Sequence, residues 1–388
     1  MTTVKMVKLG TLIKPAKLQK CGNDDYPVLS MTMHNGLVFQ SDKFKKSVAS
    51  QDKSTYKVVH RNQLVIGFPI DEGVLATQRI TDVGIVSPAY GIWDVDQTKI
   101  IPEFLEYALR CNRAIDYYKA KLRGSTARRR SLPTPTLLEL DIPLPDIEQQ
   151  RLALTTIHHA KNALDSRQAQ LTKLDELVKA RFVEMFGDKN YPYESLINLV
   201  LDGTSLSYGI VQPGNDGTGD MGVLRPVDIV DGKLTMSSIK YIDRSIGEGF
   251  KKTELDGDEL LITVRGTTGI TALIDGRFAG MNVTRGIAVI RYNRKKINPL
   301  YLNAYFNTDE SQRYIQEHTR GATLQQINLS DLRIQRIMLP PLSLQNQFAA
   351  FVAEVDKSKL FAGSAVAHKP FDIEFFSKST VQRPIKEV

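Results

Sequence analysis

The chain contains too little cysteine and too few long apolar runs for several classes of protein. Its 388 residues include two cysteines, Cys21 and Cys111, which form neither a CxxC pair nor a disulfide framework. No uninterrupted apolar segment approaches the roughly 18 residues of a membrane-spanning helix, and the N-terminus lacks a secretory apolar stretch. We therefore predict a cytoplasmic protein in a reducing setting, with no membrane partner.

Catalytic and metal-binding signatures are absent as well. The six histidines fall at no metal-ligand spacing with cysteine or carboxylates. The chain has no GxSxG, HExxH or kinase signature, and no proline-rich tetrapeptide of the kind that adenine methyltransferases place around a flipped base. The glycines at 214–219 are not followed by the lysine and hydroxyl residue of a P-loop. The sequence predicts no catalytic residue, no metal ligand and no cofactor bound by this chain.

The chain does have a moderate excess of positive charge. Its net charge of +8 and pI near 9.2 favour a polyanionic partner, although many basic proteins bind no nucleic acid. With 42% apolar and 24% charged residues, the composition is that of an ordinary globular protein of about two to three domains.

A long helix is predicted from Asp146 to Phe186, where about forty residues contain neither glycine nor proline. At a rise of ~1.5 Å per residue it would extend roughly 60 Å, far beyond an ordinary globular helix. Apolar residues recur along it at seven-residue spacing, which calls for a partner helix. The residues predicted to make this coiled-coil contact are Ile157, Leu164, Leu171, Leu174 and Val178.

Internal repetition is the strongest pattern in the sequence. When residues 56–150 are placed on residues 253–347 at a constant offset of 197, landmark residues coincide without a gap. The pattern indicates a globular unit, a long helix, a second globular unit and a second helix, with roughly 150 residues in each unit. The matched pairs include Leu64 with Leu261, Pro102 with Pro299, Arg123 and Gly124 with Arg320 and Gly321, Pro143 with Pro340, and Gln150 with Gln347.

Within the units the sequence predicts short buried strands and amphipathic helices. Leu64–Phe68 and Gly84–Val86 are β-branched and bounded by glycine or proline, as buried strands are. Residues 259–274 predict a strand, a turn and a strand, and Ile287–Ile290 another strand. A single helix from Pro102 to about Gly124 is predicted by the apolar stripe of Phe104, Ala108, Cys111, Ile115 and Tyr118.

Two homologous loops and one hairpin carry the candidate DNA contacts. Residues 121–130 have five basic side chains and no acid. They form either a solvated loop that compensates a helix dipole or, as we prefer, a loop that contacts phosphates and base edges. Residues 318–331 include glutamines, which can pair bidentately with adenine, and the turn at Arg265 is a groove reader or an ordinary hairpin. The candidates are Lys121, Arg123, Ser125, Arg128, Arg129, Arg130, Arg265, Thr267, Thr268, Arg294, Lys295, Arg320, Thr323, Gln325 and Gln326.

Five stretches occur in an order typical of one known family. They are the proline-rich exits DIPLPDIEQQ and MLPPLSLQNQ, the helix ending LTKLDELVKARFVEMFGD, and the segments YGIVQPG and VRGTTG. With the tandem repeat, they make nearly the whole chain resemble the specificity subunit of type I restriction-modification enzymes. The resemblance implies a non-catalytic subunit that binds double-stranded DNA. It also implies modification subunits that methylate adenine with S-adenosylmethionine, and through them restriction subunits that use ATP and Mg²⁺.

We therefore predict an α+β fold. Two tandemly repeated, mixed α/β target-recognition domains are separated by a long coiled-coil-forming helix, and a second, shorter helix follows at the C-terminus. The predicted segments are 1–145 and 189–342 for the domains, 146–188 for the spacer helix, and 343–388 for the second helix and tail. The rival functions are a DNA-binding scaffold or regulator without type I partners, and a nuclease or methyltransferase whose site no motif reveals.

The C-terminal segment departs from the family pattern. Phe348, Phe351 and Val355 begin a second apolar stripe and are predicted coiled-coil contacts. Pro370 interrupts the pattern, and because proline in a helix interior costs about 3 kcal/mol or more, the helix is predicted to stop near Leu360. Such a segment fits a truncated or frame-shifted end, a silent or exchangeable allele, or a chain completed by another copy.

Overall fold

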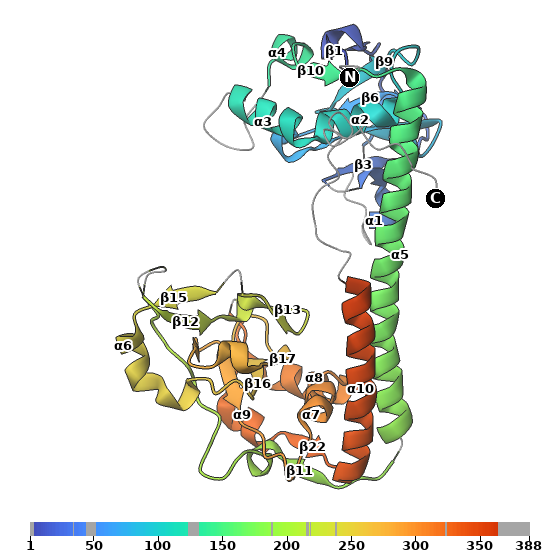
Figure 1. The fold of residues 1–388 in the computed structure, drawn as a ribbon. Coiled ribbons are helices and arrows are strands. Elements are labelled where there is room, and N and C mark those ends of the chain that lie inside the picture. Colours follow the sequence, from blue (N-terminus) through green and yellow to red (C-terminus); the bar gives the residue numbers. More distant parts are fainter. Residues whose placement is uncertain are drawn as a thin grey trace, which may run out of the picture. The chain divides into compact units, whose positions relative to one another are not determined.

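The computed structural model describes residues 4–363, except 34, 44–51, 123–131, 188, 215–216, 218, 237–238 and 323. The described residues fall into two compact units, taken from Met1–Ser166 and from Arg167–Ala365, here called the N-terminal unit and the C-terminal unit. The boundary lies inside α5 (Ile147–Phe186), the long helix drawn in green in Figure 1. Both units mix helices with short strands, so the predicted α+β fold is confirmed.

The N-terminal unit is built on an antiparallel sheet with the strand order β2-β9-β6-β7. Leu64 in the central strand β6 pairs with Trp93 of β9 and with Thr77 of β7. Leu64 and Trp93 share one core with Phe104 of helix α2. The strands are β1 (Met6–Lys8), β2 (Ile13–Pro15), β3 (Leu29–Thr32), β4 (Gly36–Phe39), β5 (Lys57–His60), β6 (Leu64–Ile66), β7 (Leu75–Thr77), β8 (Val83–Val86), β9 (Gly91–Val95) and β10 (Asp141–Pro143), and the helices are α1 (Gln40–Lys43), α2 (Pro102–Arg110), α3 (Asn112–Lys121) and α4 (Thr134–Leu138).

The single helix predicted from Pro102 is two helices in the structure, so that prediction was wrong. Cys111 is extended, with φ −69° and ψ 159°, and it separates α2 from α3. The predicted stripe is nevertheless buried, because Phe104, Ala108, Cys111 and Tyr118 all lie in the core. A break of one residue leaves the helical periodicity of burial nearly unchanged, and the apolar pattern therefore could not reveal it.

The C-terminal unit holds two three-stranded sheets, ordered β17-β16-β19 and β15-β12-β18. The strand, turn and strand predicted at 259–274 are β16 and β17, and the strand predicted at Ile287–Ile290 is β19, so both predictions are confirmed. The strands are β11 (Tyr193–Ser195), β12 (Met221–Leu224), β13 (Ile229–Val230), β14 (Lys233–Leu234), β15 (Lys240–Ile242), β16 (Leu260–Thr263), β17 (Thr271–Leu273), β18 (Asn282–Val283), β19 (Ile287–Ile290), β20 (Thr319–Arg320), β21 (Gln326–Ile327) and β22 (Arg336–Met338). The helices are α6 (Arg244–Gly247), α7 (Pro299–Phe306), α8 (Asp309–His318), α9 (Leu329–Ile334) and α10 (Leu342–Gly363).

The repeat predicted from the sequence is present, but it is not free of gaps. Helices α7 and α8 match α2 and α3 at the predicted offset of 197, whereas α9 and β22 match α4 and β10 at an offset of 195. The reason is a shorter loop, since ten residues separate α8 from α9 where twelve separate α3 from α4. Pro340 therefore corresponds to Pro145 and Gln345 to Gln150. The predicted pairs Pro143 with Pro340 and Gln150 with Gln347 were wrong.

The corrected alignment matches two fully buried glutamines, Gln150 and Gln345. Each side-chain oxygen accepts a hydrogen bond from the backbone N–H just before α2 or α7, and each side-chain amide donates to a proline carbonyl five residues earlier. Each glutamine thereby ties the start of a long helix to its own unit. The four bonds are Ile101 N to Gln150 Oε1 (2.8 Å), Gln150 Nε2 to Pro145 O (2.9 Å), Asn298 N to Gln345 Oε1 (2.9 Å) and Gln345 Nε2 to Pro340 O (2.8 Å).

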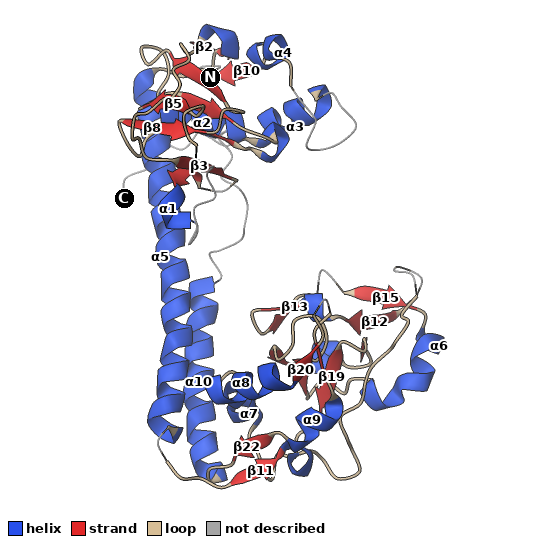
Figure 2. Ribbon diagram, turned by 180° about the vertical axis from the view of Figure 1, so that it is seen from behind, coloured by secondary structure: helices blue, strands red, loops and turns tan. Residues whose placement is uncertain are grey.

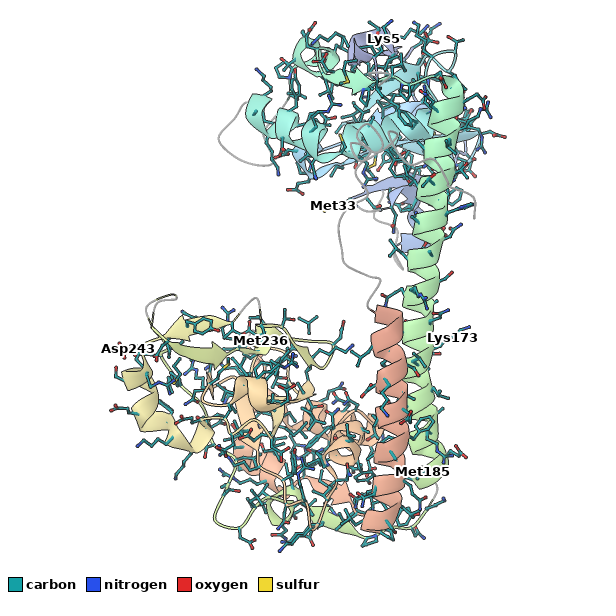
Figure 3. The ribbon with its side chains drawn as sticks, viewed as in Figure 1. Lys5, Met33, Lys173, Met185, Met236 and Asp243 are labelled. Atoms are coloured by element: carbon teal, nitrogen blue, oxygen red, sulfur yellow. The ribbon has the colours of Figure 1, made fainter. Side chains whose placement is uncertain are left out.

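Helix α10 runs beside the last turns of α5, as both ribbon views show (Figures 1 and 2). Lys359 near the end of α10 pairs with Asp175 of α5 at 2.7 Å, while Phe348 near its start packs on Phe182 and Phe186, with ring centroids 5.4 and 5.7 Å apart. The two helices are therefore antiparallel. Figure 3 labels Lys173 and Met185 on this part of α5. The structure describes α10 as far as Gly363, and Pro370 lies outside the described residues.

The burial of α5 changes along its length. Its first turns place Ala153, Leu154 and Ile157 in the core of the N-terminal unit, and its last turns place Phe182 and Phe186 in the core of the C-terminal unit. Every residue from 161 to 170 is exposed. Ile157, predicted as a coiled-coil contact, is therefore a core residue of its own unit. The seven-residue apolar spacing in the sequence could not distinguish burial in a unit's own core from burial against a partner helix.

Candidate nucleic-acid interface

The structure joins two segments that were predicted separately as DNA contacts, the turn between β16 and β17 and the hairpin of β20 and β21. Arg265 forms a β-bridge with Gln326, and the backbone N–H of Gly266 donates to the carbonyl of Gln325 at 2.9 Å. The hydroxyls of Thr268 and Thr319 lie 3.0 Å apart. These two neighbouring segments therefore carry six of the predicted DNA-contact residues: Arg265, Thr267, Thr268, Arg320, Gln325 and Gln326.

A third arginine, which the sequence analysis missed, lies beside this pair of segments. Arg285 is exposed, and its backbone N–H donates to Ile210 O at 2.9 Å. The next residue, Gly286, accepts a hydrogen bond from the N–H of Val264 at 2.8 Å, so Arg285 and Arg265 are carried by neighbouring backbone. We call Arg265, Arg285 and Arg320 the arginine cluster.

Each arginine of the cluster is followed by a glycine for a structural reason. Gly266 and Gly321 have φ of +84° and +103°, a region that residues with a side chain rarely adopt. A Cβ at Gly286 would come within 2.7 Å of Pro226 Cγ. The arginines are thus placed at tight turns and close approaches of the backbone. The Arg-Gly dipeptide, repeated at these three positions, was the sequence signal that could have identified Arg285.

The cluster retains most of its positive charge for a partner. Within the described part of the chain, neither Arg265 nor Arg285 forms an ion pair with a carboxylate. Arg320 Nη2 lies 3.7 Å from Asp331 Oδ2, which is beyond hydrogen-bond distance, and the arginine side chain is 72% exposed. These three cations are available to a polyanion.

Two other predicted contacts lie at a different turn, after β19, and one of them is held by its own unit. Arg294 donates to Asp258 at 3.0 Å and lies over the ring of Tyr292, 5.3 Å from its centroid. Hydrogen bonds from Arg294 hold the pKa of Asp258 below its ordinary value. Lys295 is exposed, and its backbone N–H donates to Asn293 Oδ1 at 3.0 Å. The structure does not bring these residues together with the arginine cluster.

The N-terminal unit presents a different surface at the equivalent turn. At the offset of 197 that holds in this part, Phe68 takes the place of Arg265, and Asp71 and Glu72 follow it. Phe68 is 54% exposed. Lys121 is exposed at the end of α3. The remaining predicted contacts Arg123, Ser125, Arg128, Arg129 and Arg130, and also Thr323 of the C-terminal unit, lie outside the described residues.

The predicted coiled-coil residues have unequal environments. Leu171, Leu174 and Val178 are half-buried along α5, and Phe348 and Val355 are buried on α10. Leu164 remains 39% exposed. The half-buried ring of Phe351 lies 5.7 Å from the guanidinium carbon of Arg181 on α5.

The described residues contain neither a cluster of metal ligands nor a candidate membrane span. No three His, Cys, Asp or Glu side chains gather as metal ligands in the described ranges. In the same part of the chain, no helix has the length and apolar character needed to cross a bilayer.

Comparison with known proteins identifies a domain that contains the arginine cluster. Residues 218–362 match the family described as the type I restriction modification DNA specificity domain. The specificity subunit of the type I restriction enzyme EcoBI from Escherichia coli is 22% identical, and the match covers 83% of this chain and 76% of that protein. The putative MjaX specificity subunit from Methanocaldococcus jannaschii is also 22% identical, over 67% of this chain and 63% of that protein.

Solved structures share the fold. A chain from a study of assembly and conformational transition in a type I restriction-modification system matches with a TM-score of 0.55 at 16% identity, covering 93% of this chain and 92% of that one. The S subunit from M. genitalium matches with a TM-score of 0.51 at 12% identity, covering 93% and 91%. The resemblance predicted from the sequence is confirmed: residues 218–362 match the type I restriction modification DNA specificity domain, and most of the chain is similar to specificity subunits of type I restriction enzymes.

Proposed function

We propose that this chain supplies DNA sequence specificity to a type I restriction-modification complex, and that each unit reads one half of a bipartite, asymmetric site. The observation that carries the proposal is the arginine cluster, which lies inside the matched specificity domain. Arginine can bind phosphates for affinity and guanine edges for discrimination. Because Phe68 replaces Arg265 in the equivalent turn of the N-terminal unit, the two units are expected to recognise different sequences.

The helices have the proposed roles of spacer and docking surface for modification subunits. Leu177 and Val183 on α5 are 48% and 64% exposed, and Leu360 on α10 is 74% exposed, so apolar contacts are open to a partner. The chain itself is not an enzyme in this proposal and binds no cofactor. Modification subunits would bring S-adenosylmethionine, and restriction subunits would bring ATP hydrolysis and Mg²⁺. The proposed compartment is the cytoplasm, where the DNA target is found.

The test is to co-express the chain with its modification subunit in a host free of DNA methylation and to map N6-methyladenine across the genome. A bipartite motif with a fixed gap is the expected result. DNA binding without methylation by the assembled complex would favour the rival function, a regulator without type I partners. Methylation or cleavage by the purified chain alone would favour an enzyme.

Arg320→Ala gives the residue-level form of this test. Removing this exposed cation should relax recognition at one half-site and leave the other unchanged, with discrimination falling roughly 10-fold because a good base contact contributes about 1–3 kcal/mol. Arg277→Ala is the matched control, since Arg277 is 71% exposed in the same unit but lies outside the cluster and is paired with Asp275. Methylation maps of both variants provide the measurement. Equal loss at both half-sites would refute the assignment.

A further inference from the structure

Three exposed aliphatic side chains gather beside the arginine cluster. Val211, Val227 and Leu324 are 50%, 70% and 48% exposed, although they come from three segments far apart in the sequence. Together with Arg265 and Arg285 they line one open pocket of about 620 Å³. We call these three side chains and their pocket the apolar notch.

The lining of the notch restricts what can occupy it. Among the described residues, its charged side chains are Arg265 and Arg285, its hydroxyl side chains are Thr267 and Thr284, and no carboxylate lines it. Two cations without an acid complement a polyanion. Three aliphatic side chains, in contrast, gain nothing from a phosphate and are stabilised by losing contact with water. An occupant that satisfies both conditions is an apolar group carried on a polyanion.

Val227 is held firmly in this exposed position. It lies in a 3-10 turn, η5 (Pro226–Asp228), closed by a bond from Arg225 N to Asp228 Oδ2 at 2.8 Å and by an ion pair from Arg225 Nη2 to Asp228 Oδ1 at 2.9 Å. Asp228 is fully buried, and Pro226 lies so close to Gly286 that a Cβ added there would come within 2.7 Å of Pro226 Cγ. The β-branched side chain of Val227 also has few rotamers to lose on binding. Its exposure is therefore fixed by the fold.

We propose that the apolar notch reads the C5-methyl group of a thymine in the half-site bound by the C-terminal unit. In the major groove thymine presents this methyl group beside an acceptor oxygen, and apolar side chains contact it in known recognition modes. Arg265 and Arg285 would bind the neighbouring phosphates or a guanine edge. This proposal rests on the proposed function. It adds that one part of the DNA-binding surface distinguishes thymine by its methyl group.

The test uses the full chain in complex with its modification subunit, and oligonucleotides that carry the mapped site. Each thymine of the half-site is replaced in turn by deoxyuridine, which removes only the methyl group. At one position the dissociation constant should rise about 3- to 10-fold, as expected for the loss of one buried methyl. Val227→Ala should abolish this difference. Val230→Ala should preserve it, because Val230 is 55% exposed on nearby β13 but does not line the notch.

The outcomes separate this proposal from the function on which it rests. If every deoxyuridine oligonucleotide binds as tightly as its thymine parent while sequence-specific binding persists, the notch does not read a methyl group and the proposed function stands. The same conclusion follows if Val227→Ala and Val230→Ala respond alike. If the wild-type complex shows no sequence-specific binding at all, the proposed function itself fails.

Discussion

Arginine side chains of the C-terminal unit differ in whether a carboxylate of the same unit already binds them. Arg285 has no carboxylate partner in the described part of the chain, whereas Arg294 is bound to Asp258 and Arg277 to Asp275, whose pKa falls to about 2 because of hydrogen bonds from Arg277. A cation that is already paired must give up its partner before it can bind DNA. Exposure alone therefore does not identify a DNA contact, and the existing partners decide which arginines are available.

This difference in existing partners predicts a large loss of DNA affinity for one substitution and a small change for another. Arg285→Ala should weaken specific DNA binding at least 5-fold. If its contact is a phosphate, the slope of log affinity against log salt should also fall by about 1. Arg294→Ala should change affinity less than 2-fold. Binding titrations at several salt concentrations test both variants, and thermal melting checks that each is folded. A larger effect from Arg294 would place the DNA surface at the turn after β19.

The candidate site was predictable from the sequence only where side chains occupied turns or loops between predicted elements. Arg265 was found at the turn between two predicted strands, and Arg320 in the loop that the repeat matches to residues 121–130. Arg285 was missed because it follows a two-residue strand, β18, that has no clear sequence pattern. Val227 and Leu324 could not be found, since exposed aliphatic side chains in loops look like any other loop residue until the fold brings them together.

Among elements, the junction between each unit and its long helix depends on a buried amide. Gln345 is fully buried and satisfied by Asn298 N and Pro340 O, while Gln347, two residues later on the same helix, is exposed. Truncating a buried amide leaves its partners unsatisfied, which costs about 1–3 kcal/mol per group. Substitution of Gln345 should therefore destabilise the junction, whereas substitution of Gln347 should be tolerated.

Gln345→Ala leaves two groups without a partner and should lower the free energy of unfolding by about 2–6 kcal/mol, whereas Gln347→Ala should lower it by less than about 0.5 kcal/mol. Denaturant unfolding followed by circular dichroism measures both changes. The comparison requires that the free energy of unfolding falls with denaturant concentration at the same slope in each variant. The pair also tests the repeat alignment, because the gapless alignment would give the important role to Gln347. Equal losses in the two variants would contradict the assignment of Gln345 as the equivalent of Gln150.

Elements with strong periodicity were predicted well, and breaks between elements were not. The long helix begins one residue after the predicted Asp146, because that carboxylate accepts a bond from Gln149 N at 2.8 Å and the helix starts at Ile147. The break at Cys111 and the shorter loop before α9 left no trace in the sequence pattern. A periodic pattern records which face is buried, and it is insensitive to a short interruption between helices.

For the whole molecule, the exposed middle of α5 is the feature with the clearest consequence. Residues 161–170 are exposed at every position, and the pairing of Asp175 with Lys359 lies beyond them. Neither core nor the helix pair therefore constrains the length of this segment. Its length can be changed without removing a buried contact from either unit.

Inserting seven helix-forming residues after Asp165 should therefore change the length of the gap between the two half-sites. The base sequence of each half-site should stay the same. Seven residues add about 10.5 Å and nearly two full turns, so the helix regains its phase to within about 20°. At about 3.4 Å per base pair, the gap should widen by roughly three base pairs. N6-methyladenine mapping measures it. The control replaces residues 161–167 with the same helix-forming sequence at constant length and should leave the gap unchanged. An unaltered gap in the insertion variant would show that α5 does not set the spacing.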